Sequence, residues 1–243
     1  MTADKLLLIV IGTVSLITSV TALVLTYRQK SRQDNLGARK TLSDVLSSII
    51  ETNIEMAKMR DEPLSEGVMQ LRRALNSQRR YLCQHADALT KEIPSLCYDI
   101  DHVIVAGAMD ASGDLEQADQ HWQAGIKKSI APITRCYNLR GYARFLLASG
   151  KVEAARTAFA QALQATPGDD DRSRRERADS RVLWAFAERD FGFEEEAIRL
   201  KDQAIVEAKR IGQAASRNDM LQYIAVHWQM PSVTDEKDAK LLS

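Results

Sequence analysis

The sequence predicts an all-helical protein built from an N-terminal transmembrane helix, a helical hairpin, and about three helix pairs closed by a capping helix. Three observations support this prediction. Glycine (11) and proline (5) are sparse in 243 residues, whereas alanine, leucine, glutamate and arginine abound, a mixture typical of helices. An uncharged run fills residues 6–27. In the second half, a glycine followed five residues later by an alanine occurs three times.

The uncharged run from Leu6 to Tyr27 has the length of a membrane-spanning helix. A helix of 22 residues reaches roughly 33 Å, against a hydrocarbon core of about 30 Å. A cleaved signal peptide fits less well, because the run is too long, residues 1–5 are barely basic and no small-residue cleavage site follows. The run therefore predicts a single-pass anchor after a short N-terminal segment, residues 1–5.

Residues 28–40 form a basic linker that predicts the orientation of the anchor. The linker holds five basic residues and one acidic residue: Arg28, Lys30, Arg32, Arg39, Lys40 and Asp34. Basic residues are retained on the cytoplasmic side of a membrane. We therefore expect a bacterial inner-membrane protein with its soluble domain in the cytoplasm. The three cysteines lack a CxxC spacing, which agrees with a compartment where thiols stay reduced.

Residues 41–93 predict a helical hairpin. Helical periodicity begins near Thr41, and the first helix ends at Asp61-Glu62-Pro63, because proline cannot continue a helix. A seam with alternating steps of four and three residues follows, as in a heptad repeat: Leu64, Val68, Leu71, Leu75, Gln78, Leu82, His85 and Leu89. Two interpretations remain open. The segment is either an antiparallel hairpin packed on the next domain or a coiled coil that makes the protein a homodimer.

Residues 94–230 carry a repeated turn. Three glycines each precede an alanine by five residues: Gly113 and Ala118, Gly150 and Ala155, Gly192 and Ala197. The glycines are 37 and 42 residues apart, and a period of this size indicates stacked helix pairs. Glycine readily adopts the positive φ that reverses the chain, and alanine allows the two helices of a pair to approach closely.

The repeated pattern resembles the tetratricopeptide repeat, most fully in residues 136–169. That copy holds the motif residues Tyr142, Ala143, Leu146, Gly150, Ala155, Phe159, Ala162 and Pro167. Copies at 99–132 and 178–211 keep the turn glycine and the alanine that follows it. The first of them has Ile130 at the proline position, and the other has Lys209 at the proline position and Lys201 at the aromatic position. Residues 213–230 then predict a capping helix, and residues 231–243, without apolar periodicity, predict a disordered tail.

Composition and motifs argue against a reaction centre. Lysine plus arginine equals aspartate plus glutamate, 33 each, so no net charge attracts nucleic acid. The four histidines are scattered, and no metal-binding pair, phosphate-binding glycine loop or nucleophile motif occurs. We therefore expect a protein that is not an enzyme and has no cofactor or metal, with an enzyme of unrecognised site as the alternative.

The resemblance implies a concave groove lined by the first helix of each pair, which receives peptides or helices. The groove positions of the repeat are assigned to this sequence by aligning the motif residues. The resulting candidate protein-binding residues are Tyr137, Arg140, Arg144, Leu147, Val182, Phe186 and Arg189, with Val103 and Asp110 from the first copy. Arg140 and Arg144 lie one helical turn apart and suit a carboxylate or an acidic segment. The alternative is two solvated arginines without a partner.

Residues 169–177 are a charged insertion between the second and third copies. This segment predicts a solvated loop and an early helical turn with local ion pairs, or alternatively a basic finger for an acidic partner.

Together these features predict a membrane-anchored scaffold or adaptor that binds a protein or peptide segment on the cytoplasmic face. An alternative keeps the fold but turns the array toward the envelope, as a chaperone or assembly factor for exported proteins.

Overall fold

The computed structural model describes the backbone of residues 3–60, 62–63 and 65–229, and the side chains of these residues other than 3–28 and 31. Within these ranges the chain forms nine α-helices and one short 3-10 helix, without a strand, which confirms the all-α fold class. The chain divides into two compact units, Met1–Cys97 and Tyr98–Ser243, and each is described by itself.

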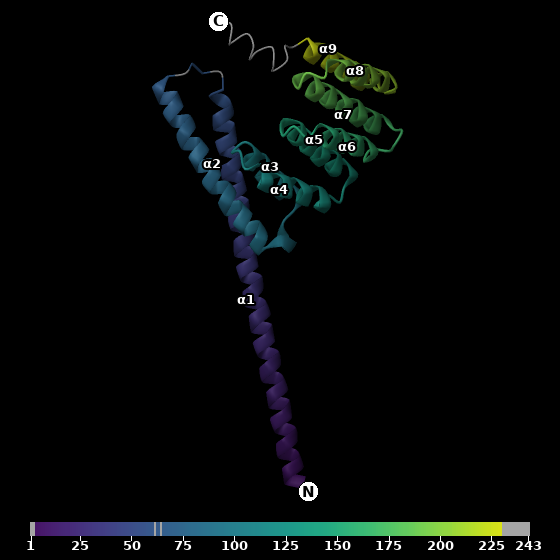
Figure 1. The fold of residues 1–243 in the computed structure, drawn as a ribbon. Helices are drawn as coiled ribbons and strands as arrows, with labels where there is room; N and C mark the ends of the chain where they lie inside the picture. Colours follow the sequence, from purple (N-terminus) through teal and green to yellow (C-terminus); the bar gives the residue numbers. More distant parts are fainter. Residues whose placement is uncertain (1–2, 61, 64, 230–243) are drawn as a thin grey trace. The chain divides into compact units, whose positions relative to one another are not determined.

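The first unit is an antiparallel hairpin of two long helices, α1 (Ala3–Lys58) and α2 (Glu66–Glu92), followed by the 3-10 turn η1 (Pro94–Leu96) (Figure 1). Ser65 caps α2, because its hydroxyl accepts a hydrogen bond from the Val68 N–H at 3.3 Å. The Arg72 guanidinium donates to the carbonyl oxygen of Met59 across the turn. Leu42 and Ile49 of α1 are fully buried.

The structure corrects the prediction of a transmembrane helix at residues 6–27. In the part of the chain that the structure describes, no helix is both long enough and apolar enough to cross a membrane. The side chains of residues 6–27 lie outside the described residues, and their backbone belongs to α1. Because α1 is one helix of 56 residues, the expected linker at 28–40 is not a separate segment but continues the same helix through its charged residues.

The buried face of α2 lies one residue away from the predicted heptad seam. Leu71 and Gln78 on that seam are exposed, and Leu82 is half-buried. The buried positions of α2 are Arg79, Cys83, Ala86 and Thr90, each one residue beyond a seam position, together with Leu89, which belongs to the seam. Small side chains such as Cys83 and Ala86 allow close helix packing, which favours burial of their stripe over the one that carries Leu71 and Leu82.

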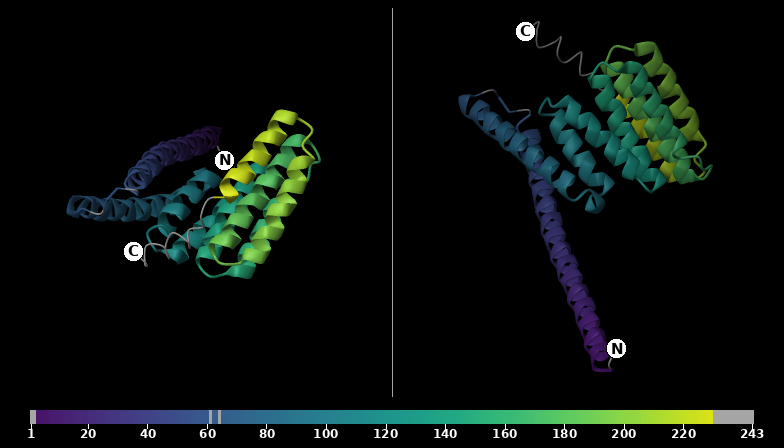
Figure 2. Two further views of the ribbon diagram at one scale, coloured as in Figure 1. Left: turned by 90° about the horizontal axis from the view of Figure 1, so that it is seen from above. Right: turned by 60° about the horizontal axis from the view of Figure 1, so that its bottom comes forward.

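The second unit consists of three antiparallel helix pairs and a final helix (Figure 2). The pairs are α3 (Asp99–Asp110) with α4 (Leu115–Lys128), α5 (Pro132–Ala148) with α6 (Val152–Gln164), and α7 (Asp171–Asp190) with α8 (Glu194–Lys209), followed by α9 (Ala214–Trp228). Each pair packs on the next, and α9 packs against both α7 and α8.

Three glycines reverse the chain within the pairs, as the sequence predicted. Gly113, Gly150 and Gly192 have φ values of +83°, +75° and +84°, in the region that disfavours residues with a Cβ atom. The alanines five positions later are all fully buried between helices: Ala118, Ala155 and Ala197. The glycine and alanine of each copy therefore have the local roles expected of them.

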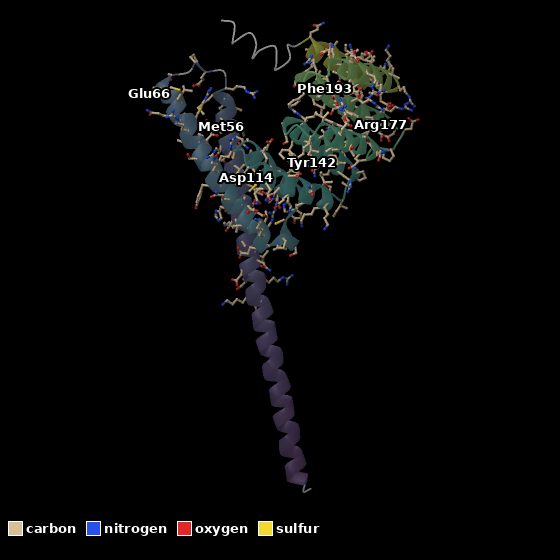
Figure 3. The ribbon with its side chains drawn as sticks, in the orientation of Figure 1. Met56, Glu66, Asp114, Tyr142, Arg177 and Phe193 are labelled. Atoms are coloured by element: carbon tan, nitrogen blue, oxygen red, sulfur yellow. The ribbon has the colours of Figure 1, made fainter. Side chains whose placement is uncertain are left out.

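The charged insertion at residues 169–177 is held by contacts within the chain and is not a free basic finger. Asp170 caps α7, and the Asp171 carboxylate accepts hydrogen bonds from the backbone N–H groups of residues 212 and 213, at 2.7 and 2.8 Å, where α9 begins. Arg174 pairs with Asp169 at 3.0 Å. Arg177, labelled in Figure 3, donates to the Thr166 carbonyl oxygen at 2.8 Å and pairs with a carboxylate of α8. The expected tail at residues 231–243 lies outside the described residues.

Candidate functional site

The first helices of the second and third pairs and the final helix form one continuous surface in the second unit, because α5 packs on α7 and α7 packs on α9. A pocket of about 290 Å³ opens on this surface. Side chains from all three helices line the pocket: Tyr137 from α5, Arg175, Glu176 and Asp179 from α7, and Met220 and Tyr223 from α9.

Arg140 lies at the edge of this pocket and is already neutralised by the chain itself. Its Nη1 donates to Asp179 Oδ2 at 2.8 Å and to Ser180 Oγ at 3.2 Å, and lies 3.9 Å from a Glu176 carboxylate oxygen. Its guanidinium also stacks 4.6 Å from the centre of the Tyr137 ring. Since only 10% of the Arg140 side chain is exposed, it binds α5 to α7 and is not available to a guest carboxylate.

Two tyrosines, Tyr137 and Tyr223, line the pocket together with its carboxylates. The Tyr137 hydroxyl donates to Glu176 Oε1 at 3.0 Å. Burial, this hydrogen bond and the nearby negative charge raise the pKa of Tyr137. Burial and the charge of Asp179 likewise raise the pKa of Tyr223. Both phenols therefore stay protonated at neutral pH and can serve as hydrogen-bond donors.

An aromatic and cationic cluster continues the same surface toward the end of the unit. The ring of Phe186 stacks on Trp228 at 6.1 Å between centroids, and Arg189 lies 5.0 Å from the centre of the Trp228 ring. Arg189 Nη1 also donates to the carbonyl oxygen of Trp228 at 3.1 Å. His227 packs against both Phe186 and Tyr223. These contacts hold α9 on α7.

The structure separates the seven groove residues predicted in the second and third copies into three groups. Tyr137 lines the pocket, and Arg144 is exposed on α5 one turn beyond Arg140. Arg140, Phe186 and Arg189 mainly join neighbouring helices through the contacts given above. Leu147 and Val182 are each 1% exposed, so they belong to the core and cannot contact a guest.

Sequence reasoning missed the acidic residues Glu176 and Asp179 and the α9 residues of the pocket. The contacts between neighbouring helices join positions that are 39 residues apart, whereas the last two turn glycines are 42 residues apart. Aligning the helices with a spacing of 39 residues could have identified these pocket residues. Tyr137 bonds Glu176, Arg140 bonds Asp179 and Arg189 bonds Trp228, each 39 positions further along. Because α7 begins within the insertion, its pocket residues Arg175 and Glu176 precede the third copy at residues 178–211, and Asp179 lies at the start of that copy.

A second pocket of about 470 Å³ lies at the turn between α7 and α8, beside Phe193 (labelled in Figure 3). Its two arginines are occupied, Arg156 by Glu188 and Arg199 by Glu196. Its acidic residues lie in the first turn of α8, where negative side chains stabilise the positive end of the helix dipole. The helix dipole and these ion pairs thus account for the charges of this pocket.

The described residues contain no group of three or more histidine, cysteine, aspartate or glutamate side chains arranged to hold a metal ion. Cys83, Cys97 and Cys136 are buried. For Cys136, burial raises the thiol pKa, which disfavours the reactive thiolate. His102 and His121 contact each other between α3 and α4, with 3.0 Å between their Nδ1 atoms.

No protein-family model matches the chain, and comparisons with curated proteins and with solved structures also give no match.

Proposed function

We propose that the second unit is a protein-interaction module of the tetratricopeptide type, which binds an extended or helical segment of another protein on the surface of α5, α7 and α9. Its role is that of a scaffold or adaptor and involves no reaction. Stacked helix pairs present a long surface built from equivalent helices, which suits recognition of a segment better than of a small molecule.

The observation that carries this proposal is the pocket between α5, α7 and α9. A pocket bordered by Tyr137, Tyr223 and Met220 offers apolar surface next to polar groups, the combination that anchors one side chain of a bound segment. Tyrosine contributes a large contact area at low cost in conformational entropy. Of the two rings, Tyr137 is 45% exposed and therefore reachable from solvent.

The proposal is tested by selecting peptides from a random 12-residue display library on the immobilised full chain. We expect selected peptides to bind at least tenfold more weakly to Tyr137→Ala and Tyr223→Ala variants that retain the circular dichroism spectrum of the parent. Tyr81→Ala is the matched control, because Tyr81 is 67% exposed on α2 of the first unit. Peptides that bind all four proteins equally, or a selection that yields none, would contradict the proposed function.

A further inference from the structure

Arg181 on α7 has buried hydrogen-bond donors that no described residue satisfies. Its Nε and Nη1 atoms are buried and have no hydrogen-bond partner. Its contact with Glu207 Oε2, at 3.7 Å, is an ion pair but too long for a hydrogen bond. Burial lowers the pKa of Arg181, Glu207 opposes this shift, and the charge of Arg177 adds to it. The protein therefore does not fully replace the water that this guanidinium has lost.

Glu207 cannot satisfy Arg181, because three arginines share this carboxylate. Arg177 donates to Glu207 Oε1 from Nε at 3.0 Å and from Nη2 at 2.5 Å, and Arg210 lies 3.7 Å from Oε2. The network of ion pairs to which they belong joins four arginines and three carboxylates: Arg174, Arg177, Arg181, Arg210, Asp169, Asp171 and Glu207. Each of the other arginines contacts two carboxylates of this network, whereas Arg181 contacts one. The network therefore has a positive charge in excess, and Arg181 is its least compensated member.

Arg181 lines a pocket of about 400 Å³ between α7 and α8. Since 20% of its side chain is exposed, a guest in this pocket reaches the guanidinium. The loose contact with Glu207 also allows the end of the Arg181 side chain to turn its donors toward a stronger acceptor. The remaining lining residues all come from α8: Arg199, Asp202, Gln203, Val206 and Glu207.

The other charged groups of this pocket have partners of their own. Arg199 donates two hydrogen bonds to the Glu196 carboxylate, one of them from Nε at 2.8 Å. Asp202 lies 3.7 Å from Lys201, and its side chain is 65% exposed, so water screens its charge. These pairs are neutral, and the excess charge at the pocket is that of Arg181.

The uncharged lining residues indicate which kind of anion fits. Gln203 is exposed, and its amide group offers a further N–H donor. Val206 is 61% exposed and offers apolar surface beside it. A carboxylate accepts two parallel hydrogen bonds from a guanidinium, and its single charge matches the single excess charge of the network. A phosphate group, with a charge of about −1.5 to −2 at neutral pH, matches it less well.

We propose that this pocket binds a carboxylate group attached to a short apolar chain, with Arg181 and Gln203 as hydrogen-bond donors and Val206 in contact with the chain. The site shares no lining residue with the pocket between α5, α7 and α9, so this inference goes beyond the proposed function and does not depend on it. A free short-chain carboxylate and an acidic side chain of a protein carry the same chemistry, and the probes below distinguish them.

The test titrates butyrate, its neutral isostere butyramide and inorganic phosphate into the full chain, labelled with ¹⁵N at arginine and with ¹³C at the valine methyl groups. NMR follows the Nε–Hε signal of Arg181 and the methyl signals of Val206. We expect saturable shifts of both with butyrate, and at least fivefold weaker binding of butyramide and of phosphate. Nα-acetyl-glutamate methylamide is the fourth probe. Binding at least fivefold tighter than that of butyrate would identify a protein side chain as the ligand, and weaker binding a free carboxylate.

Two variants locate the site. Arg181→Gln should weaken butyrate binding at least tenfold, measured at Val206. Because Glu207 keeps Arg177 and Arg210 as partners, this variant leaves no unpaired carboxylate and should fold. Gln203→Glu changes an exposed side chain and places a carboxylate in the pocket itself, so it should weaken butyrate at least fivefold.

Arg135→Gln is the matched control for the loss of charge, because Arg135 is exposed on α5 and does not line this pocket. It should change butyrate binding less than twofold. Equal binding of butyrate and butyramide would overturn the inference, and so would tighter binding of phosphate. Butyrate binding that survives unchanged in both Arg181→Gln and Gln203→Glu would overturn it as well. Peptides selected through Tyr137 and Tyr223 should bind Arg181→Gln as they bind the parent, so the two proposals fail separately.

Discussion

Gly141 illustrates at the scale of one residue how closely α4 and α5 approach. A Cβ atom on Gly141 would lie 2.5 Å from Cη2 of the Trp122 ring, which is itself 8% exposed. Such overpacking typically costs about 1–3 kcal/mol, and the higher helix propensity of alanine offsets about 1 kcal/mol of it at most. We therefore expect Gly141→Ala to lower the free energy of unfolding in urea titrations.

Gly107 in α3 is the matched control for this substitution, because a Cβ atom there meets nothing within 4 Å. Gly107→Ala should stabilise the protein by up to about 1 kcal/mol, since only the propensity term acts. If both variants change stability in the same direction, the close contact with Trp122 is not what determines glycine at position 141.

Glu188 is a fully buried carboxylate that joins α6 to α7. Its oxygens accept hydrogen bonds from Arg156 Nε and Nη2, both at 2.9 Å, and from Trp184 Nε1 at 2.8 Å. Glu188→Gln preserves the shape but places an amide N–H group against a donor and removes the charge that offsets Arg156. We expect a loss of about 2–4 kcal/mol, measured by urea unfolding at pH 7.

Glu153 pairs with the same arginine at 3.1 Å but is 86% exposed, which makes it the control for Glu188. Glu153→Gln should change stability by no more than about 0.5 kcal/mol, because exposed ion pairs contribute little. Comparable losses in the two variants would mean that burial of Glu188 is not decisive.

At the scale of one element pair, α3 and α4 are joined by two buried histidines. The pKa of His102 is lowered to about 4 by burial, by the neighbouring His121 and by Lys128, although Asp101 opposes the shift. In the unfolded chain the pKa of a histidine is about 6.5. Between about pH 4 and this value, the unfolded state therefore binds more protons than the folded state. Stability is therefore complete above about pH 6.5 and falls as the pH decreases toward about 4.

This pH dependence should amount to about 1–3 kcal/mol across that interval. Urea unfolding at pH 7.5, 6.0 and 5.0 measures it, and the comparison with His102→Gln isolates the contribution of this side chain. The variant should show a shallower dependence on pH in the same interval. Parallel curves for the two proteins would show that His102 is as easily protonated in the folded state as in the unfolded chain.

The sequence was sufficient for features that depend on neighbouring residues. Gly113, Gly150 and Gly192 could be recognised as turns because a positive φ is a local requirement of the backbone. The all-helical fold could be predicted from composition because helix propensity is also a local property of individual residues. The apolar run at residues 6–27 predicted a membrane-spanning helix from its hydropathy alone, whereas no helix in the described part of the chain is both long and apolar enough to cross a membrane.

Contacts between helices could not be predicted in the same way. The buried face of α2 depends on which of two adjacent stripes α1 approaches. The partners of Arg140 depend on a 39-residue offset between α5 and α7, whereas the turn glycines suggested 42. An arginine that would be exposed on an isolated helix is therefore buried and paired in the folded unit.

At the scale of the whole molecule, the second unit has its own core and its own pattern of cross-links. Salt bridges and hydrogen bonds connect α6 with α7, α5 with α7, and α7 with α9. Buried residues from α7, α8 and α9 form one apolar cluster that includes Val182, Ala208 and Ile224. In such arrays, stability is roughly the sum of the helix pairs and the contacts between neighbours.

We therefore expect residues 98–243 expressed alone to fold cooperatively, with a melting temperature within a few degrees of the matching transition in the full chain. The Glu188→Gln variant provides the control, because it acts on the α6–α7 contact. The loss of unfolding free energy that it causes should agree within about 0.5 kcal/mol in the fragment and in the full chain, as expected for independent sites. Circular dichroism and urea titration measure both quantities. A fragment that is unfolded, or in which the effect of the variant differs markedly, would show that this unit depends on residues 1–97 for its stability.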